Sequence, residues 1–296
     1  MKTKRSNDKM KVGFYAVCFI DLLGQRDRLS ALHDLPDQAD KEQMEVFFHN
    51  LGETYGVVSR NRKLFRHFFN SFSAPRQTDL SGLTSEQQAL YKQMTNNPIR
   101  LMPLSDSIIA FTSLATDINK VPMRAIYGMF VAASSVALLS LSVGTPVRGG
   151  IDIGIGMEIE EGEIYGPCLA RAYTLESSLA QYPRILVGSE CLDYLQLSLR
   201  KKPEDIFDQI TIDTARVCHG LLMIDDDGCA ALDYLGANYR STIADLMEKT
   251  TVKEAYDNVV KFSEVFRQNN DTKNALRLTL LRNYFERRFE DWKLDA

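Results

Sequence analysis

Two aspartates lie next to short apolar runs, at positions where a strand is expected to end. Asp21 follows the apolar run at 15–20, and Asp106 lies between the runs at 100–104 and 107–112. A carboxylate beside apolar neighbours is costly to desolvate unless another group compensates its charge. Two carboxylates about 4 Å apart would repel each other by roughly 4 kcal/mol at an effective dielectric constant near 20. A shared magnesium or manganese ion, which prefers oxygen ligands, would remove that penalty.

Each aspartate also has a structural interpretation. Asp21 could cap a helix that begins at Leu22, because aspartate is a favoured N-cap residue. Asp106 could be an ordinary turn residue. The two positions lie far apart in the chain, so the sequence leaves open whether they meet.

The elements that would position these aspartates alternate irregularly between strand and helix. We expect strands at 15–20, 100–104, 107–112, 147–155 and 184–188, and a hairpin within 221–235. We expect helices at 42–69, 119–142, 166–180 and 190–199, and helices only after Asn238. This order indicates an α+β fold with helices on one face of the sheet, not a regular βαβ series.

The composition is that of an ordinary soluble globular protein. The 296 residues carry 35 Lys and Arg against 39 Asp and Glu, a net charge of −4, which argues against a binder of polymeric nucleic acid. Five cysteines without a CxxC pair argue against a disulfide framework or a structural zinc site, and fit a reducing cytoplasm. The uncharged stretch at 126–144 is almost long enough to span a bilayer, but its four serines favour a buried core helix.

Four segments, in this order, resemble the class III nucleotide cyclases. FIDLLGQ at 19–25 and PLSDSIIAF at 103–111 resemble the two metal-binding motifs of that family. VRGGIDIG at 147–154 and IYGPCLARAYTLE at 164–176 resemble the strand and helix that follow them. The resemblance covers about residues 12–235. It is nearest to the pyrimidine cyclases of bacterial Pycsar antiphage systems, which act on UTP or CTP.

The resemblance implies a division of the chain and a role for several residues. It implies a class III cyclase catalytic domain at 1–236, with a ferredoxin-like βαββαβ core and extra strands, and C-terminal helices at 237–296. Asp21 and Asp106 match the aspartates that hold two Mg²⁺ or Mn²⁺ ions per site, with the carbonyl of Leu22 as a further metal ligand. The residues whose backbone amides would lie against the triphosphate are Leu22, Leu23, Gly24 and Gln25. A glycine in such a turn lets the backbone approach a phosphate closely.

The positions that read a purine base in the family differ in this chain. Where purine-specific members place an Asn and an Arg on a helix, this chain has Ala170 and Thr174. The adenine-reading Asp falls near Glu163, and the base-reading Lys falls near Met102. This difference implies either a pyrimidine pocket or a degenerate, inactive cyclase. The basic residues best placed to act instead are Arg171 and Arg148 on transition-state charge, and Arg100 on a base carbonyl.

The resemblance therefore implies a cytoplasmic pyrimidine cyclase that converts UTP to 3′,5′-cyclic UMP and pyrophosphate, a second messenger in antiphage defence. It implies a head-to-tail homodimer with an active site between the two chains, and a downstream cyclic-nucleotide effector outside this chain. The alternatives are a cytidylate cyclase that makes cyclic CMP, and a catalytically inactive nucleotide-sensing module. A diguanylate cyclase is disfavoured because the sequence has no GGDEF-like stretch.

Overall fold

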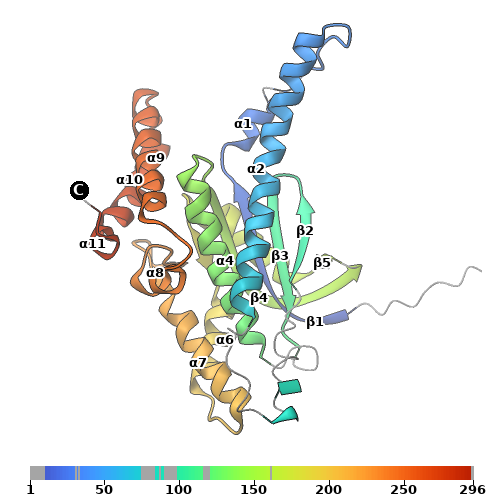
Figure 1. Cartoon of the computed structure of the whole chain (residues 1–296), viewed down its shortest axis with the longest axis vertical. Coiled ribbons are helices and arrows are strands. Elements are labelled where there is room, and N and C mark those ends of the chain that lie inside the picture. The colour runs from blue at the N-terminus through green and yellow to red at the C-terminus, as the bar shows by residue number, and fades with distance from the viewer. Residues whose placement is uncertain are drawn as a thin grey trace, which may run out of the picture.

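The computed structural model describes residues 11–30, 32, 34–74, 84–86, 88–89, 99–115, 121–160 and 162–294. The strands are β1 (Lys11–Leu22), β2 (Arg100–Leu104), β3 (Ser107–Ser113), β4 (Val147–Glu160), β5 (Glu163–Tyr165), β6 (Ile185–Val187), β7 (Leu222–Ile224) and β8 (Ala230–Leu232). The helices up to residue 220 are α1 (Gln25–Ser30), α2 (Lys41–Ser73), α4 (Pro122–Ser142), α5 (Pro167–Thr174), the π-helical turn η2 (Leu175–Leu179), α6 (Ser189–Arg200) and α7 (Ile206–Gly220). The C-terminal helices are α8 (Ala237–Ile243), α9 (Lys249–Gln268), α10 (Thr272–Glu286) and α11 (Phe289–Trp292). Figure 1 shows their arrangement.

The structure confirms the expected mixed α+β class. The helices and strands expected from the sequence are all present, with ends that shift by a few residues. The helix expected at 119–142 begins at Pro122, and residues 119–120 lie outside the described part. Three elements had no counterpart among the expectations: helix α1, the short strand β5 and helix α7.

The strands form a single mixed sheet with β1 near its middle. The order is β2-β3-β1-β4-β6-β8-β7, and β5 pairs with β4. β1 is antiparallel to both β3 and β4, while β4 and β6 are parallel. The register places Asp21 directly opposite Ser107 on one side and opposite Arg148 on the other. The C-terminal end of β1 therefore meets the β2–β3 turn and the start of β4.

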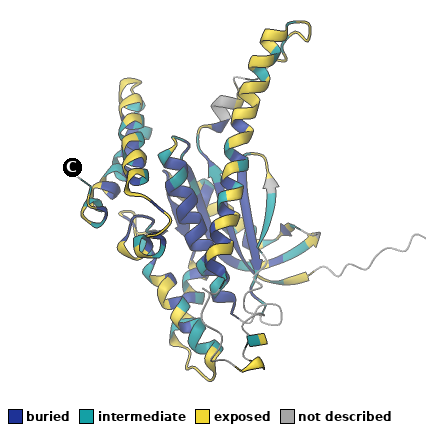
Figure 2. Cartoon of the chain, in the orientation of Figure 1, coloured by how far each residue is buried: buried dark blue, intermediate teal, exposed yellow. Residues whose placement is uncertain are grey.

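Helices cover both faces of the central strands, so the expectation of helices on one face only is wrong. One face of β1 packs into the main core with α2 and α4. The other face packs against α5, through Val17 and Phe19 of β1 and Cys168 and Ala172 of the helix. The reason lies in the apolar run itself, because a strand without polar alternation is buried on both faces. Figure 2 shows the resulting buried centre.

A glycine in β4 permits the close approach of α5 to the sheet. A Cβ at Gly150 would lie 2.4 Å from the Cβ of Leu175 and 2.5 Å from the carbonyl oxygen of Ala172. Those separations are shorter than side-chain packing allows, so only glycine fits there. The glycine-rich sequence of β4 thus serves helix packing.

Helix α4 is the core helix that the uncharged stretch predicts. Seventeen of its 21 residues are buried, between the sheet, α2 and α9. Among the described residues it is the one helix long and apolar enough to cross a membrane, and most of it is buried inside the protein. Two of its buried serines differ, since the Ser135 hydroxyl is 2.8 Å from the Tyr239 hydroxyl, whereas the Ser140 hydroxyl has no hydrogen-bond partner among the described residues.

The C-terminal helices share the main core with the sheet. α9 packs against α4, and the side-chain amide of Asn258 donates to the carbonyls of Leu141 (3.1 Å) and Ser142 (2.8 Å) at the end of α4. Trp292 donates through Nε1 to the carbonyl of Leu235 at 2.8 Å. One buried cluster includes residues from both sides of position 237.

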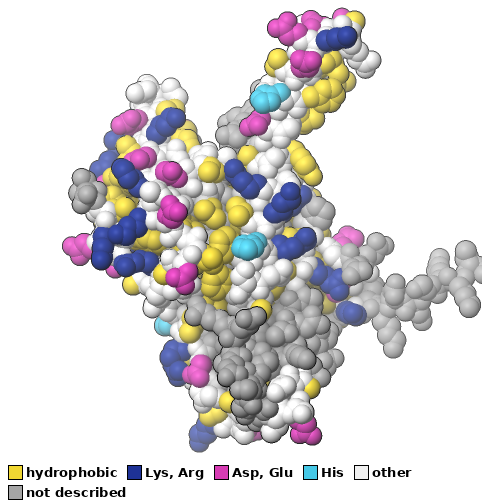
Figure 3. Space-filling view, viewed as in Figure 1, with side chains coloured by type: hydrophobic (Ala, Val, Ile, Leu, Met, Phe, Trp, Pro, Cys, Tyr) yellow, Lys and Arg dark blue, Asp and Glu magenta, His cyan; other side chains and the backbone are white. Residues whose placement is uncertain are grey.

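The first half of α2 extends away from the rest of the molecule (Figure 1). The first buried residue of this helix is Thr54, so about 20 Å of helix before it carries no buried side chain. Phe48 and Tyr55 are 59% and 67% exposed. Figure 3 shows apolar side chains along this projecting segment.

Candidate functional site

The structure brings Asp21 and Asp106 together at one end of the central strands. Asp21 is the next-to-last residue of β1, and Asp106 lies in the turn between β2 and β3. The Ser107 hydroxyl donates to Oδ1 of Asp21 at 3.0 Å. Burial raises the pKa of Asp21 above its ordinary value, and the charge of Asp106 raises it further, against the Ser107 hydrogen bond. The two carboxylates are therefore close enough to interact electrostatically, which a site shared between them requires.

Arg148 and Glu176 complete this cluster. Arg148 faces Asp21 across the strand pair, and its Nε donates to Oε1 of Glu176 at 2.6 Å. Burial raises the pKa of Glu176, the Arg148 guanidinium lowers it, and the charges of Asp21 and Asp106 raise it. Arg148 thus pairs with Glu176 and lies beside Asp21, while Nη2 of Arg62 donates to the carbonyls of Ser105 (3.1 Å) and Ser107 (3.0 Å) on either side of Asp106.

The sequence analysis assigned no role to Glu176, although its position carried a usable signal. Cys168, Ala172 and Glu176 follow one another at four-residue spacing on the expected helix, and all three are buried. An acidic residue in register with the apolar face of a helix is unusual unless it has a partner. Here that partner is Arg148.

The turn after β1 meets the phosphate-binding expectation only in part. The backbone N–H of Leu22 lies near the Asp21 carboxylate and lowers its pKa, and the N–H of Leu23 donates to the carbonyl of Pro146 at 2.9 Å. Gly24 is exposed and has φ of +80°, a left-handed conformation that favours glycine. Gln25 is 2% exposed, and its Oε1 has no hydrogen-bond partner among the described residues. The backbone at Gly24 is thus the part of this turn that is open to a ligand.

Arg171 lies apart from this cluster within the same chain. Its guanidinium contacts Asp152 (2.8 Å), Ser189 (3.1 Å) and Glu190 (3.2 Å). Asp152 lies four residues beyond Arg148 on β4, a separation of about 13 Å along the strand. Asp152 is 2% exposed and also accepts the backbone N–H of Cys191. Arg171 therefore compensates a buried carboxylate in this chain.

Arg100 and Glu163 lie toward the other end of the sheet. Arg100 begins β2, and its Nε is 2.8 Å from Oε1 of Glu158. Glu163 is exposed in β5, which pairs with the final residues of β4. Asp21, by contrast, pairs with Arg148 at the start of β4. The sequence-derived site residues thus fall into two groups at opposite ends of the same strands.

The donor set at the aspartate group suits a hard divalent cation. Mg²⁺ is usually held by one or two carboxylates, with the remaining positions filled by water and substrate phosphates. Asp21 and Asp106 provide such a pair, and a strand-end carbonyl such as that of Leu22 is a chemically suitable third ligand. Within the described ranges, no group of three or more His, Cys, Asp or Glu side chains is placed to hold an ion. Two carboxylates alone would leave most positions of such an ion to water or to the oxygens of a bound ligand.

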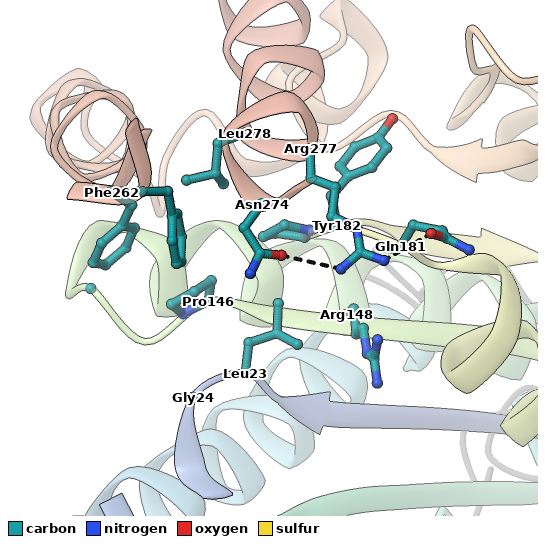
Figure 4. Close-up of a pocket in the computed structure, with 13 residues that line it drawn as sticks. Leu23, Gly24, Pro146, Arg148, Gln181, Tyr182, Phe262, Asn274, Arg277 and Leu278 are labelled. Carbon is teal, nitrogen blue, oxygen red and sulfur yellow. Dashed lines mark hydrogen bonds between the residues drawn. The ribbon is translucent and has the colours of Figure 1, made fainter. Parts of the chain in front are cut away.

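A pocket opens beside the aspartate group, between the turn after β1 and the C-terminal helices. Its volume is about 350 Å³, and its lining includes Leu23, Gly24 and Arg148. Figure 4 shows that α10 closes the side opposite to these residues. The lining holds a glycine turn and arginines, which suit an anionic ligand, and it includes neither Asp21 nor Asp106.

Comparison of the sequence with known protein families and with curated proteins found no relative. The chain matches no model of a known protein family, and no curated protein matches its sequence. The functional interpretation consequently depends on the residues of the chain and their geometry.

Proposed function

We propose that this chain is a nucleotide cyclase of the class III type that converts UTP to 3′,5′-cyclic UMP and pyrophosphate. The observation that carries the proposal is the meeting of Asp21 and Asp106 beside the Gly24 turn. The strand order β2-β3-β1-β4, with α2 and α4 as the connections, is the order of a ferredoxin-like βαββαβ core and supports the same assignment. The five free cysteines support a protein of the reducing cytoplasm.

In the proposed reaction, the ribose 3′-oxygen forms a bond to the α-phosphorus and the bond to the bridging oxygen breaks. Pyrophosphate leaves with the bonding electron pair, and the hydroxyl proton passes to solvent. Divalent cations held by Asp21 and Asp106 would lower the pKa of the 3′-hydroxyl and neutralise the departing phosphates. Arg148 stabilises negative charge on the phosphates, and the Gly24 turn lets the backbone approach them. The protein thus acts by position and charge.

A head-to-tail homodimer would unite the two groups of site residues. Asp21 and Asp106 lie at one end of the sheet, and Arg100 and Glu163 lie at the other, so each site would draw on both chains. Exposed apolar side chains near the second group support an interface there, because directly paired Phe14 and Ile155 are 59% and 53% exposed. Arg171, on the face covered by α5, would belong to the group that the partner supplies.

A pyrimidine substrate is proposed because the purine-reading Asn and Arg are absent. Their positions hold Ala170 and Thr174, both exposed on α5. UTP is preferred and CTP is the alternative, which would give cyclic CMP. The product would act as a second messenger in antiphage defence, through an effector that is a separate protein.

The test is incubation of the purified full-length protein with Mn²⁺ and each of the four nucleoside triphosphates, with products identified by mass spectrometry. We expect cyclic UMP or cyclic CMP, and cyclic AMP alone would overturn the pyrimidine assignment. Asp21→Asn and Asp106→Asn should each abolish product while thermal melting stays cooperative. Asp257→Asn is the matched control, because Asp257 is exposed, lies 3.6 Å from Lys253 and does not line the pocket. Turnover retained in either site variant would refute the metal-binding role.

The second candidate is a nucleotide-binding module that has lost catalysis. The same departures at Ala170 and Thr174 favour it. Micromolar or tighter UTP binding with no cyclic product from any triphosphate would establish it. The paired aspartates argue against it, since a binder gains nothing from two mutually repelling carboxylates without cations.

A further inference from the structure

The pocket beside the aspartate group has arginines on two facing walls that are far apart in the chain. Arg148 enters from β4, and Arg277 enters from α10. Figure 4 shows the guanidinium group of Arg277 directed from α10 toward β4, while that of Arg148 points away from α10, where its Nε binds Glu176. The sequence analysis left the role of residues 237–296 open, and this pocket joins them to the candidate site.

Arg277 differs from the other arginines described above in the partners of its guanidinium. Its Nη2 donates to Oε1 of Gln181 at 2.8 Å, and its Nη1 donates to Oδ1 of Asn274 at 3.2 Å. Both acceptors are neutral, and no carboxylate among the described residues forms an ion pair with it. Arg148 and Arg171, in contrast, each bind a buried carboxylate. The positive charge of Arg277 is therefore held in place without being neutralised.

The surroundings of Arg277 strengthen its attraction for an anion. Phe262, Phe266 and Leu278 line the same pocket with apolar surface, which lowers the local dielectric constant and strengthens charge interactions. The position of α10 is fixed, because the Tyr284 hydroxyl donates to Asp233 at 2.9 Å and accepts the backbone N–H of Leu235 at 2.8 Å. A pre-positioned guanidinium binds phosphate oxygens through paired N–H donors with little loss of entropy.

We propose that Arg277, held by Asn274 and Gln181, acts with Arg148 as a polyphosphate-binding pair. The inference rests on the proposed function in one respect, that the polyphosphate is the β- and γ-phosphate portion of the nucleotide substrate. Arg277 is a substrate-binding residue in this reaction, because it contacts the phosphates that leave as pyrophosphate. The C-terminal helices thereby form one wall of the active site.

The first test measures binding without any reaction, by calorimetric titration of the full-length protein with inorganic tripolyphosphate in the presence of Mg²⁺. Arg277→Gln should weaken binding about 10- to 100-fold, the usual range for loss of a charge-assisted hydrogen-bond pair. Arg277→Lys keeps the charge but not the paired geometry, so it should recover only part of the affinity. Arg282→Gln is the matched control on the same helix, because Arg282 is 39% exposed and pairs with Glu286. It should bind tripolyphosphate as the unaltered protein does.

The second test separates this inference from the proposed function. With UTP and Mn²⁺, Arg277→Gln should raise KM by a similar factor and change the melting temperature as little as Arg282→Gln does. If no triphosphate is turned over but tripolyphosphate binding depends on Arg277, the proposed function fails and the phosphate site stands. If Arg277→Gln binds tripolyphosphate normally, or if Arg282→Gln loses affinity equally, the inference is overturned whatever the turnover.

Discussion

Replacement of Asp225 by alanine should destabilise the protein strongly, because it would leave a buried arginine without its buried carboxylate partner. Arg184 and Asp225 are 4% and 5% exposed, and Nη1 lies 2.6 Å from Oδ2. The Tyr182 hydroxyl also donates to Asp225. Breaking a buried ion pair by removing one partner costs about 3–5 kcal/mol. We expect about 3 kcal/mol, since Asp227 remains 2.6 Å from Nη2 of Arg184.

The neighbouring residue provides the control for this prediction. Asp226 pairs with Arg287 at 3.0 Å, but both side chains are about half exposed, so Asp226→Ala should cost no more than about 1 kcal/mol. Urea denaturation followed by far-UV circular dichroism measures both variants. Asp225→Ala should also lower the melting temperature by about 5 °C, since a chain of 296 residues has an unfolding entropy of about 0.6 kcal/mol/K. Equal, small losses in the two variants would refute the reasoning that burial decides the strength of these pairs.

Three further predictions concern pH and packing. Arg184 lowers the pKa of Asp227 to about 2. The pair therefore contributes fully to the free energy of unfolding above about pH 4, and this contribution is lost as the pH falls through about 2. The difference in unfolding free energy between the natural chain and Asp227→Asn, measured in urea, should shrink over that range, and a constant difference would contradict the reasoning. Gly150→Ala would place a Cβ 2.4 Å from Leu175 and should cost about 1–3 kcal/mol by the same assay. Gly52→Ala meets no atom within 4 Å on exposed α2 and should stabilise by about 0.5–1 kcal/mol; destabilisation there would show that α2 is not free as described.

Much of the fold could be predicted from local patterns in the sequence. The apolar run of β1, the paired runs of β2 and β3, and the uncharged stretch of α4 each gave the correct element, because burial selects the residue types directly. The placement of α5 on the second face of the sheet was not foreseen. It depends on the close approach that Gly150 permits, and glycines in a strand do not indicate which neighbour approaches them.

The sequence identified those site residues that an aspartate at the expected end of a strand already marks. Whether Asp21 and Asp106 meet was left open by the sequence, and they do so because the hairpin β2–β3 pairs with β1 in a register that sets Ser107 opposite Asp21. Glu176 and Arg277 were missed, since each depends on long-range packing that brings η2 and α10 to the same sheet edge. The separation of Arg171 from Asp21 has the same origin, because the partner of Arg171 is the buried Asp152 of β4.

The central position of β1 has a consequence for biosynthesis. This strand leaves the ribosome first among the strands, yet its two neighbours are β3 and β4. At a synthesis rate of roughly 5–20 residues per second, β4 begins to emerge roughly 6–25 s after β1 is complete. During that interval an apolar strand lacks one of its partners and is open to wrong pairing or capture by a chaperone. The Asp21 cluster can therefore assemble only late in synthesis, and slower translation before β4 should lower the yield of active protein.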